Sequence, residues 1–224
     1  MRQMICLAGL LLFLTGGAVG ASQSAAAAPT RGAGRHSEAL KQLSAEDQAG
    51  ILYGDGYAFL ISAPKGWILD DDTGRAEGVL AVFYRRGESW VRGKATCYAN
   101  AVLKRKGHED TLEKVVQADL DSSRQQDPEM KATPVETMAT GDGRRAVVFT
   151  LEGPGTGRKL EKIAYIDTPR AVVMLVLTST DPAAYEKALP DLTQLVRSFL
   201  FMADRVTVTY HSTKASKGRK KQQR

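Results

Sequence analysis

The sequence predicts an α+β fold in which a central antiparallel sheet is flanked by helices. Several short segments alternate apolar and polar residues, which is typical of strands with one buried face. Tight turns that contain Gly or Pro separate successive strands, and turns this short join antiparallel neighbours. Two helical segments interrupt the strands without alternating regularly with them, which favours an α+β arrangement over a doubly wound parallel sheet.

The first strand is predicted at residues 57–63, where aromatic and branched residues alternate with smaller ones. The Pro-Lys-Gly turn at residues 64–66 ends this strand, and Trp67 behind the turn is expected in the core. Residues 70–78 are polar and are predicted to form a loop. Further strands are predicted at residues 79–84, 94–104, 132–140, 145–152, 159–167 and 200–210.

Two of the later strands differ in their expected burial. The strand at residues 145–152 is expected to bury Val147, Phe149 and Leu151. The segment at residues 171–177 (Ala-Val-Val-Met-Leu-Val-Leu) is apolar at every position, which is typical of a central strand covered on both faces.

Two helices are predicted from their capping signals. Asp110 and Glu113 have the spacing of a capping box, and residues at helical spacing behind them form an apolar face. Asp181 is predicted to cap the second helix, with Pro182 at its first position. Because Pro190 interrupts the apolar face of this second segment, we expect either a kinked helix or two short ones.

Residues 1–21 have the composition of a secretory signal peptide. Arg2 precedes an apolar stretch at residues 5–14, and small residues suited to signal peptidase lead to an expected cleavage near residue 20 or 21. The apolar stretch is shorter than a bilayer span requires, although an uncleaved N-terminal membrane anchor is the alternative. The protein is therefore expected to be exported to the periplasm or the extracellular space.

The mature chain is expected to contain one folded domain at residues 51–210. Residues 22–50 are predicted to form a flexible leader with a possible short helix at residues 36–48. The formal net charge of +6 arises from a basic tail at residues 211–224, which is predicted to be disordered, because the rest of the chain is close to neutral. Cys97 is the sole cysteine beyond the leader, so the domain is expected to be stable without an internal disulfide.

The chain from Gly56 to Trp67 resembles the opening of PsbP-like domains, with an aromatic strand followed by a Pro-x-Gly-Trp turn. The resemblance covers residues 51–200 and continues through Asp110-Thr-Leu-Glu-Lys, the hairpin at residues 143–150, Lys162-Ile-Ala-Tyr165, the apolar strand to Leu177 and the helix that ends at Ser198-Phe199. It implies an α/β/α sandwich with a central antiparallel sheet and a mostly non-enzymatic family. Its best-known member is an extrinsic subunit of photosystem II, and a fold relative binds the Ran GTPase. A shared fold does not transfer these partners.

The motifs of common enzymes and metal sites do not match the sequence. His36, His108 and His211 are scattered and lack the spacing of a zinc site. The glycine-rich segment at residues 153–157 lacks the Walker spacing, and the acidic run at residues 70–72 lacks the ligand spacing of a calcium loop. There is no Gly-x-Ser-x-Gly elbow, and Cys97 has no neighbouring histidine in the sequence to activate it. We therefore predict no catalytic residue, metal or cofactor.

The candidate partner-binding residues lie in a loop and in the tail. An exposed Trp90 beside Arg92 would mark a protein contact, and packing of Trp90 onto a sheet edge is the alternative. The tail is expected to contact anionic lipid or polymer rather than nucleic acid, because it lacks interleaved aromatic residues, and a purely solubilising role is the alternative. The tail candidates are Lys217, Arg219, Lys220 and Lys221.

Two functions agree with these features. The first is an exported, non-catalytic interaction or assembly domain that binds a protein or another envelope component. The alternative is a carrier of a small apolar ligand held between sheet and helix. A large apolar pocket would favour the carrier, whereas an exposed patch around Trp90 would favour the interaction domain. No oligomeric state is predicted.

Overall fold

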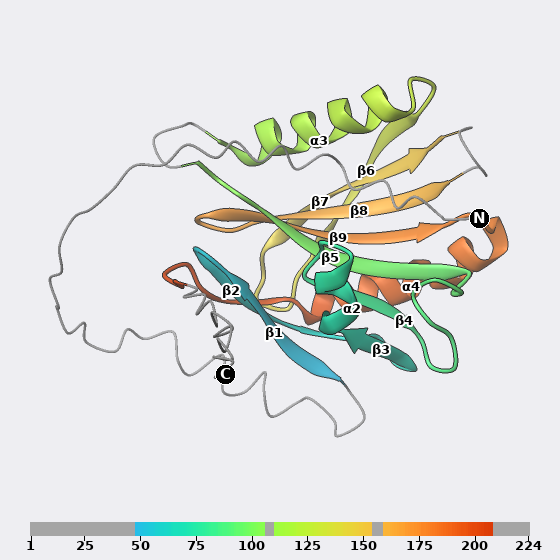
Figure 1. The fold of residues 1–224 in the computed structure, drawn as a ribbon. Helices are drawn as coiled ribbons and strands as arrows, with labels where there is room; N and C mark the ends of the chain where they lie inside the picture. The colour runs from blue at the N-terminus through green and yellow to red at the C-terminus, as the bar shows by residue number, and fades with distance from the viewer. Residues whose placement is uncertain (1–47, 106–109, 154–158, 208–224) are drawn as a thin grey trace, which may run out of the picture.

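The computed structural model describes residues 48–105, 110–153 and 159–207 (Figure 1). Within them the chain forms ten strands and three helices, and the predicted α+β class is confirmed. In chain order the elements are β1 (Ala49–Gly54), β2 (Tyr57–Ser62), β3 (Trp67–Asp70), α2 (Asp71–Ala76), β4 (Ala81–Arg85), β5 (Ala95–Leu103), α3 (Leu112–Gln126), β6 (Lys131–Ala139), β7 (Arg145–Glu152), β8 (Leu160–Asp167), β9 (Ala171–Ser179), α4 (Pro182–Ser198) and β10 (Leu200–Ala203).

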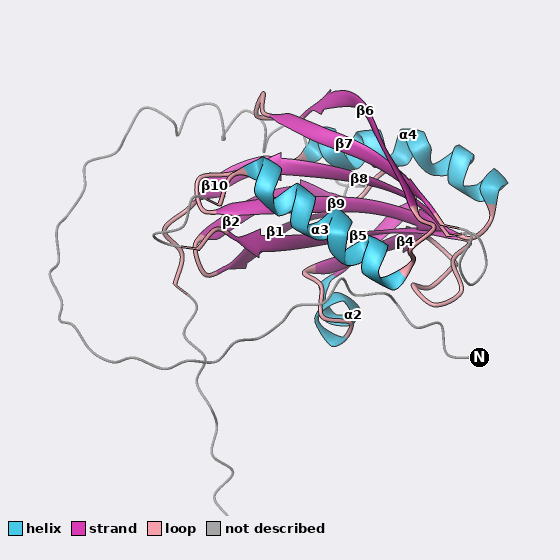
Figure 2. Ribbon diagram, turned by 90° about the horizontal axis from the view of Figure 1, so that it is seen from above, coloured by secondary structure: helices cyan, strands magenta, loops and turns pink. Residues whose placement is uncertain are grey.

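The strands form two sheets whose neighbours are all antiparallel, as predicted. The large sheet has the order β3-β4-β5-β9-β8-β7-β6, and the small sheet has the order β1-β2-β10. Figures 1 and 2 show α3 across one face of the large sheet and α4 on its other side. The large sheet is therefore the middle layer between the two long helices.

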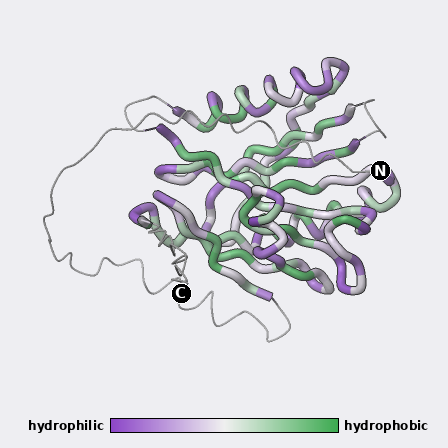
Figure 3. The backbone as a smooth tube through the Cα atoms, in the orientation of Figure 1, coloured by the Kyte–Doolittle hydropathy of each residue, from purple (hydrophilic) through white to green (hydrophobic). Residues whose placement is uncertain are grey.

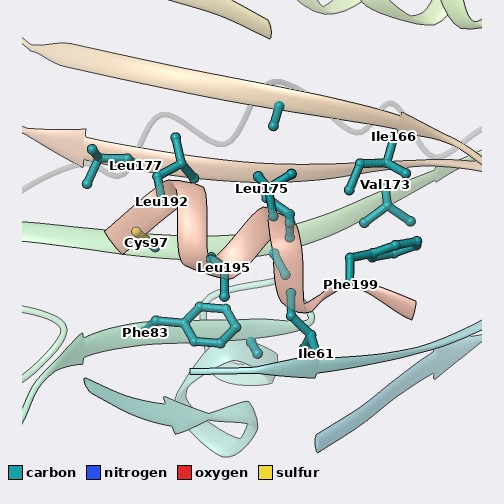
Figure 4. Packing of buried hydrophobic residues seen from close by; sticks show 14 of the residues in the cluster. Ile61, Phe83, Cys97, Ile166, Val173, Leu175, Leu177, Leu192, Leu195 and Phe199 are labelled. Atoms are coloured by element: carbon teal, nitrogen blue, oxygen red, sulfur yellow. The ribbon is translucent and has the colours of Figure 1, made fainter. Parts of the chain in front are cut away.

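The strand β9 lies in the middle of the large sheet and is buried on both faces, as predicted. Its residues Val173, Leu175 and Leu177 belong to the cluster that contains α4 (Figure 4). Val172 and Val176 belong to the cluster under α3. Figure 3 shows the corresponding contrast, with hydrophobic residues along the strands and hydrophilic residues at the turns. Because each face of β9 has its own apolar cover, one strand connects the two cores.

The predicted inward face of β7 is only partly correct. Leu151 is buried, but Val147 and Phe149 are half-buried, and the fully buried residues of the strand are Ala146 and Val148 on the opposite face. Like β9, β7 carries apolar residues on both faces. The helix α3 covers the face that carries Val147 and Phe149 only incompletely. This incomplete cover creates the groove described below.

The polar segment at residues 70–78 is not a loop, because α2 occupies most of it. Asp70 caps this helix by accepting hydrogen bonds from the Thr73 backbone N–H and hydroxyl, each at 2.8 Å. Gly74 allows the helix to lie against β4, since a Cβ at this position would lie 2.6 Å from the Cα of Ala81. The helix therefore depends on a cap and a close approach rather than on an apolar face.

Each long helix differs from its prediction in one respect: α3 in its N-cap, and α4 in its continuity through Pro190. The N-cap of α3 is Thr111, whose Oγ1 accepts the Lys114 N–H, whereas Asp110 accepts the backbone N–H of Arg105 at 2.7 Å. The N-cap of α3 therefore lies one residue after the predicted cap at Asp110. The helix α4 begins at the Asp181 cap as predicted but continues through Pro190 as a single helix.

Packing explains why α4 continues beyond its proline. Leu192, Leu195 and Val196 are fully buried after it. Figure 4 shows the first two of them facing the sheet. Their burial offsets the backbone hydrogen bond that Pro190 cannot donate.

The first and last strands of the described residues differ from the predicted ones. The strand β1 begins at Ala49, before the expected boundary at residue 51, and the last strand covers Leu200–Ala203 rather than residues 200–210. The predicted signal peptide and basic tail lie outside the described residues, as does nearly all of the predicted leader. No helix in the described segments is both long and apolar enough to span a bilayer.

Candidate interaction site

The two sheets have four edge strands, and an unpaired edge exposes backbone N–H and C=O groups to other chains. Natural sheets protect such edges with short strands, bulges, charges or proline. Both edges of the large sheet carry protection of this kind. The strand β6 contains Pro134 and Glu136 and has a register shift between Val135 and Met138. The strand β3 is four residues long and ends at the Asp70 cap.

The β10 edge of the small sheet is covered by the turn between β6 and β7. The carboxylate of Asp142 accepts the backbone N–H of Phe201 at 3.0 Å. The guanidinium of Arg144 lies 4.7 Å from the centre of the Phe201 ring. The register of this strand also shifts after Phe201. A second chain therefore meets charged side chains at this edge.

The β1 edge has none of these protective features. Its sequence, Ala-Gly-Ile-Leu-Tyr-Gly, contains no charge and no proline, and the strand pairs with β2 along its whole length without a shift. Leu52 is buried in the core, whereas Ile51 and Tyr53 are 52% and 59% exposed. The strand therefore presents two large apolar side chains beside an open backbone edge.

Hydrogen-bond alternation shows which backbone groups of β1 are open. The Ala63 N–H donates to the Gln48 carbonyl at 2.8 Å, which makes these two opposed residues a hydrogen-bonded pair. Because such pairs alternate along an antiparallel ladder, Leu52 directs its N–H and C=O toward β2. Ile51 and Tyr53 direct theirs away from β2, and β1 pairs with no further strand in the described part of the chain.

A groove lies between α3 and the edge of the large sheet. It has a volume of about 340 Å³, near the lower end of the range for small-molecule sites. Its lining is mostly apolar, with three polar side chains contributed by α3. The lining residues are Leu112, Glu113, Val116, Gln117, Leu120, Arg124, Ala132, Val147 and Phe149.

The helix α3 is tied to the sheet by one buried polar contact. The Tyr165 hydroxyl on β8 donates to Asp119 Oδ2 on α3 at 2.6 Å, and Tyr165 is fully buried. Burial raises the pKa of Asp119, with a further increase from nearby Glu161, and the Tyr165 hydrogen bond only partly opposes this increase. Burial and the Asp119 charge likewise raise the pKa of Tyr165. This pair joins α3 to β8, with the Tyr165 side chain fully buried and Asp119 half-buried.

The structure places Trp90, the candidate loop contact, in a buried position, whereas a partner site would need it exposed. The Trp90 ring is 9% exposed, packs with Val79 and Val82, and meets Tyr98 edge-to-face at 6.1 Å. Trp90 therefore packs onto the sheet, as the alternative expected, but over β4 and β5 rather than on an edge strand. Arg92 is exposed. The tail candidates Lys217, Arg219, Lys220 and Lys221 lie outside the described residues, so their role stays a prediction.

Three side chains that the sequence raised as candidates for chemistry have other roles in the fold. Asp71 and Asp72 pair with Arg75 at 2.9 and 2.7 Å. Cys97 is fully buried, and burial raises the pKa of its thiol, with a smaller contribution from Asp191. The thiol is therefore protonated and unavailable as a nucleophile at neutral pH. Among the described residues, no group of three His, Cys, Asp or Glu side chains is arranged to hold a metal ion.

Sequence reasoning identified neither the β1 edge nor the groove. The available signal for the edge was an uncharged run with Ile51 and Tyr53 just before the predicted first strand. The signal for the groove was a second set of apolar residues on β7, because Val147 and Phe149 alternate with the buried Ala146 and Val148.

No protein-family model matches this sequence, and no curated protein matches it. Several solved structures have a similar chain arrangement. They include a cyanobacterial PsbP (CyanoP) from Synechocystis sp. PCC 6803, with 16% identity and a TM-score of 0.48 over 72% of this chain and 95% of that chain.

Two further structures have comparable similarity. The Ran-binding protein Mog1p of Saccharomyces cerevisiae has 13% identity and a TM-score of 0.45 over 70% of this chain and 96% of its own. LpqN, involved in cell envelope biogenesis of Mycobacterium tuberculosis, has 17% identity and a TM-score of 0.46 over 70% of this chain and 91% of its own. At these identities, no residue role is carried over to this chain.

Proposed function

We propose that this protein is an exported, non-catalytic interaction domain that docks onto a protein of the cell envelope. The observation that supports the proposal most strongly is the exposure of Ile51 and Tyr53 on a strand without charge. Large apolar side chains gain free energy when a partner removes them from water, and tyrosine is enriched at the centres of protein interfaces. Met202, at the other edge of the small sheet, is 40% exposed. We assign the docking surface to the exposed face of β1.

The non-catalytic part of the proposal is supported by how the reactive groups are used. The Cys97 thiol is buried, and the carboxylate of Asp70 caps α2 while accepting the Tyr84 hydroxyl at 2.9 Å. Asp119 is engaged with Tyr165 beneath α3. General acid–base or nucleophilic catalysis requires such groups to converge at an accessible cleft. Export is supported by the predicted signal peptide at residues 1–21.

The experiment compares capture of envelope proteins by three forms of the exported protein. Wild type is expected to retain a stoichiometric partner, and the double variant Ile51→Lys/Tyr53→Lys is expected to retain at least about tenfold less of it, since two apolar contacts are lost. Val91→Lys is the matched control, because Val91 is apolar, 69% exposed and distant in sequence from β1. Thermal unfolding should confirm that all three fold alike.

Equal capture of the same partner by wild type and the double variant would show that the β1 surface is not the contact. Equal loss in the Val91→Lys control would attribute the effect to added positive charge rather than to β1.

A second candidate function is carriage of a small apolar ligand, which the groove under α3 favours. Titration with the fluorescent fatty acid cis-parinaric acid tests it. Ala132→Trp is expected to fill the groove and abolish the fluorescence increase. Thr133→Trp is the control, because the next residue of β6 points to the opposite face of the strand. No micromolar binding by wild type, or equal binding by both variants, would exclude this function for the groove.

A further inference from the structure

We propose that the edge of β1 that no described strand pairs with joins β1 of a second copy of this chain, which makes two small sheets into one continuous antiparallel sheet. The inference concerns the backbone edge of β1, whereas the proposed function concerns its exposed face. Either can therefore fail without the other. Figure 1 shows β1 at the outer side of the small sheet, next to β2.

Of the four edge strands that the structure describes, β1 alone lacks a feature that would keep another strand from pairing with it. The large sheet ends in a strand with proline, charge and a register shift, and in a four-residue strand. At the β10 edge, Asp142 occupies the N–H of Phe201. The β1 edge has six paired residues, no shift and no charged side chain. An uncharged, regular edge is the kind that accepts another strand.

The backbone of β1 is self-complementary about Leu52. In a two-fold antiparallel pair centred there, Ile51 opposes the partner subunit's Tyr53, and Tyr53 opposes the partner subunit's Ile51. Both residues direct N–H and C=O away from β2, so each opposed pair can exchange both hydrogen bonds. In a register shifted by one residue, a residue whose N–H and C=O point away from β2 would lie opposite a residue whose N–H and C=O already bond to β2. The alternation therefore excludes that shifted register.

The side chains of this pairing are also compatible. Ile51 and the partner subunit's Tyr53 lie on the same face of the joined sheet, as a β-branched and aromatic cross-strand pair, a favourable combination. The nearest charge in the sequence, Asp55, lies at opposite ends of the paired strands in the two copies. No like charges therefore meet at the centre of the contact.

A second copy is favoured over an unrelated strand because its β1 presents the same uncharged edge, with backbone N–H and C=O groups that alternate in the matching pattern. A two-fold pair uses β1 of both copies and, among the described strands, leaves the protected edges of β3, β6 and β10, so assembly stops at two chains. Two six-residue strands form a small interface. The pair is therefore expected to be a weak dimer that dissociates on dilution.

Sedimentation velocity of the exported protein from micromolar to millimolar concentration tests the pairing. The average mass is expected to rise from one chain toward two. Ile51→Lys/Tyr53→Lys is expected to weaken dimerisation by about tenfold or more, because charged side chains then face each other across the strands. Val91→Lys should leave it unchanged. Monomer at every concentration, or an equally strong dimer in the double variant, would overturn the proposal.

Hydrogen exchange distinguishes strand pairing from another form of dimer. The amides of Ile51 and Tyr53 are expected to exchange rapidly at low concentration and to become protected in the dimer, while the amide of Leu52, directed toward β2, keeps its protection. A dimer without this change would overturn the edge pairing. Protection that appears only on addition of envelope extract would assign the edge to another protein and overturn the second copy as its occupant.

Discussion

Replacing Phe199 by alanine is expected to lower the free energy of unfolding by about 3–5 kcal/mol, the usual cost of removing a buried phenylalanine. Phe199 is fully buried where α4 ends, and its ring lies 5.0 Å from that of Phe59 on β2. Figure 4 shows it near Ile61, Ile166 and Val173, which come from both sheets. The cavity that the alanine variant leaves would therefore loosen the packing of the small sheet against the rest of the fold.

Urea unfolding of the wild type and the Phe199→Ala variant measures this effect. The matched control is Phe201→Ala, because Phe201 lies two residues later but is half-buried beside Arg144. Its loss is expected to cost about 1 kcal/mol, as less apolar area is buried. Equal losses for the two variants would contradict the central position of Phe199.

Replacing Tyr165 by phenylalanine is expected to lower the free energy of unfolding at neutral pH by about 2 kcal/mol. The variant removes the 2.6 Å hydrogen bond and leaves the half-buried carboxylate of Asp119 without this donor. The free energy of unfolding from urea denaturation at pH 7 measures the loss. An unchanged value would show that Asp119 finds another donor or water when Tyr165 is absent.

The variant Asp119→Asn should act in the opposite direction at neutral pH. The folded protein raises the pKa of Asp119 above its ordinary value of 3.8, chiefly through burial and also through Glu161, so the ionised carboxylate opposes folding. The group therefore costs no stability below its unfolded pKa and costs most above its raised folded pKa. Asparagine keeps an acceptor for Tyr165 without the charge.

The stability gain of Asp119→Asn over wild type is therefore expected at pH 7 and should shrink as the pH falls toward 3.8. Urea unfolding at a series of pH values measures it, with Asp121→Asn on the exposed side of α3 as the control. A gain that grows as the pH falls would contradict the raised pKa.

The sequence predicted best the elements that have a strong local signal. The run at residues 171–177 is apolar at every position, and this can only be a segment covered on both sides. The Asp181 cap followed by proline located the start of α4 to the residue. Both signals act within a few residues, so no knowledge of the rest of the fold was needed.

The elements that the sequence missed depend on long-range contacts. The strand β1 has Leu52 as its one large inward side chain, since Gly50 and Gly54 occupy the other inward positions, so no apolar alternation is visible. The helix α2 is polar throughout and is held by the Asp70 cap and by Gly74 against Ala81. Neither contact has a periodic signature.

The candidate site was harder to predict than the fold for the same reason. An edge strand is defined by the order of strands in the sheet, and that order follows from the pairing of β2 with β10, far apart in the sequence. The sequence offered Trp90 as a candidate contact but favoured its packing onto the sheet, and only the assembled strands show that Val82 and Tyr98 cover it. Exposure is therefore a property of the assembled sheet rather than of the residue type.

The most direct test of the central claim, that the exposed face of β1 docks onto another protein, is photo-crosslinking in intact cells. The photoreactive residue p-benzoylphenylalanine replaces Tyr53 in one variant and Val91 in another, since both side chains are well exposed. We expect position 53 to give a product with a different envelope protein and position 91 to give none. A product at position 53 that contains only two copies of this chain, or equal products at both positions, would contradict the claim.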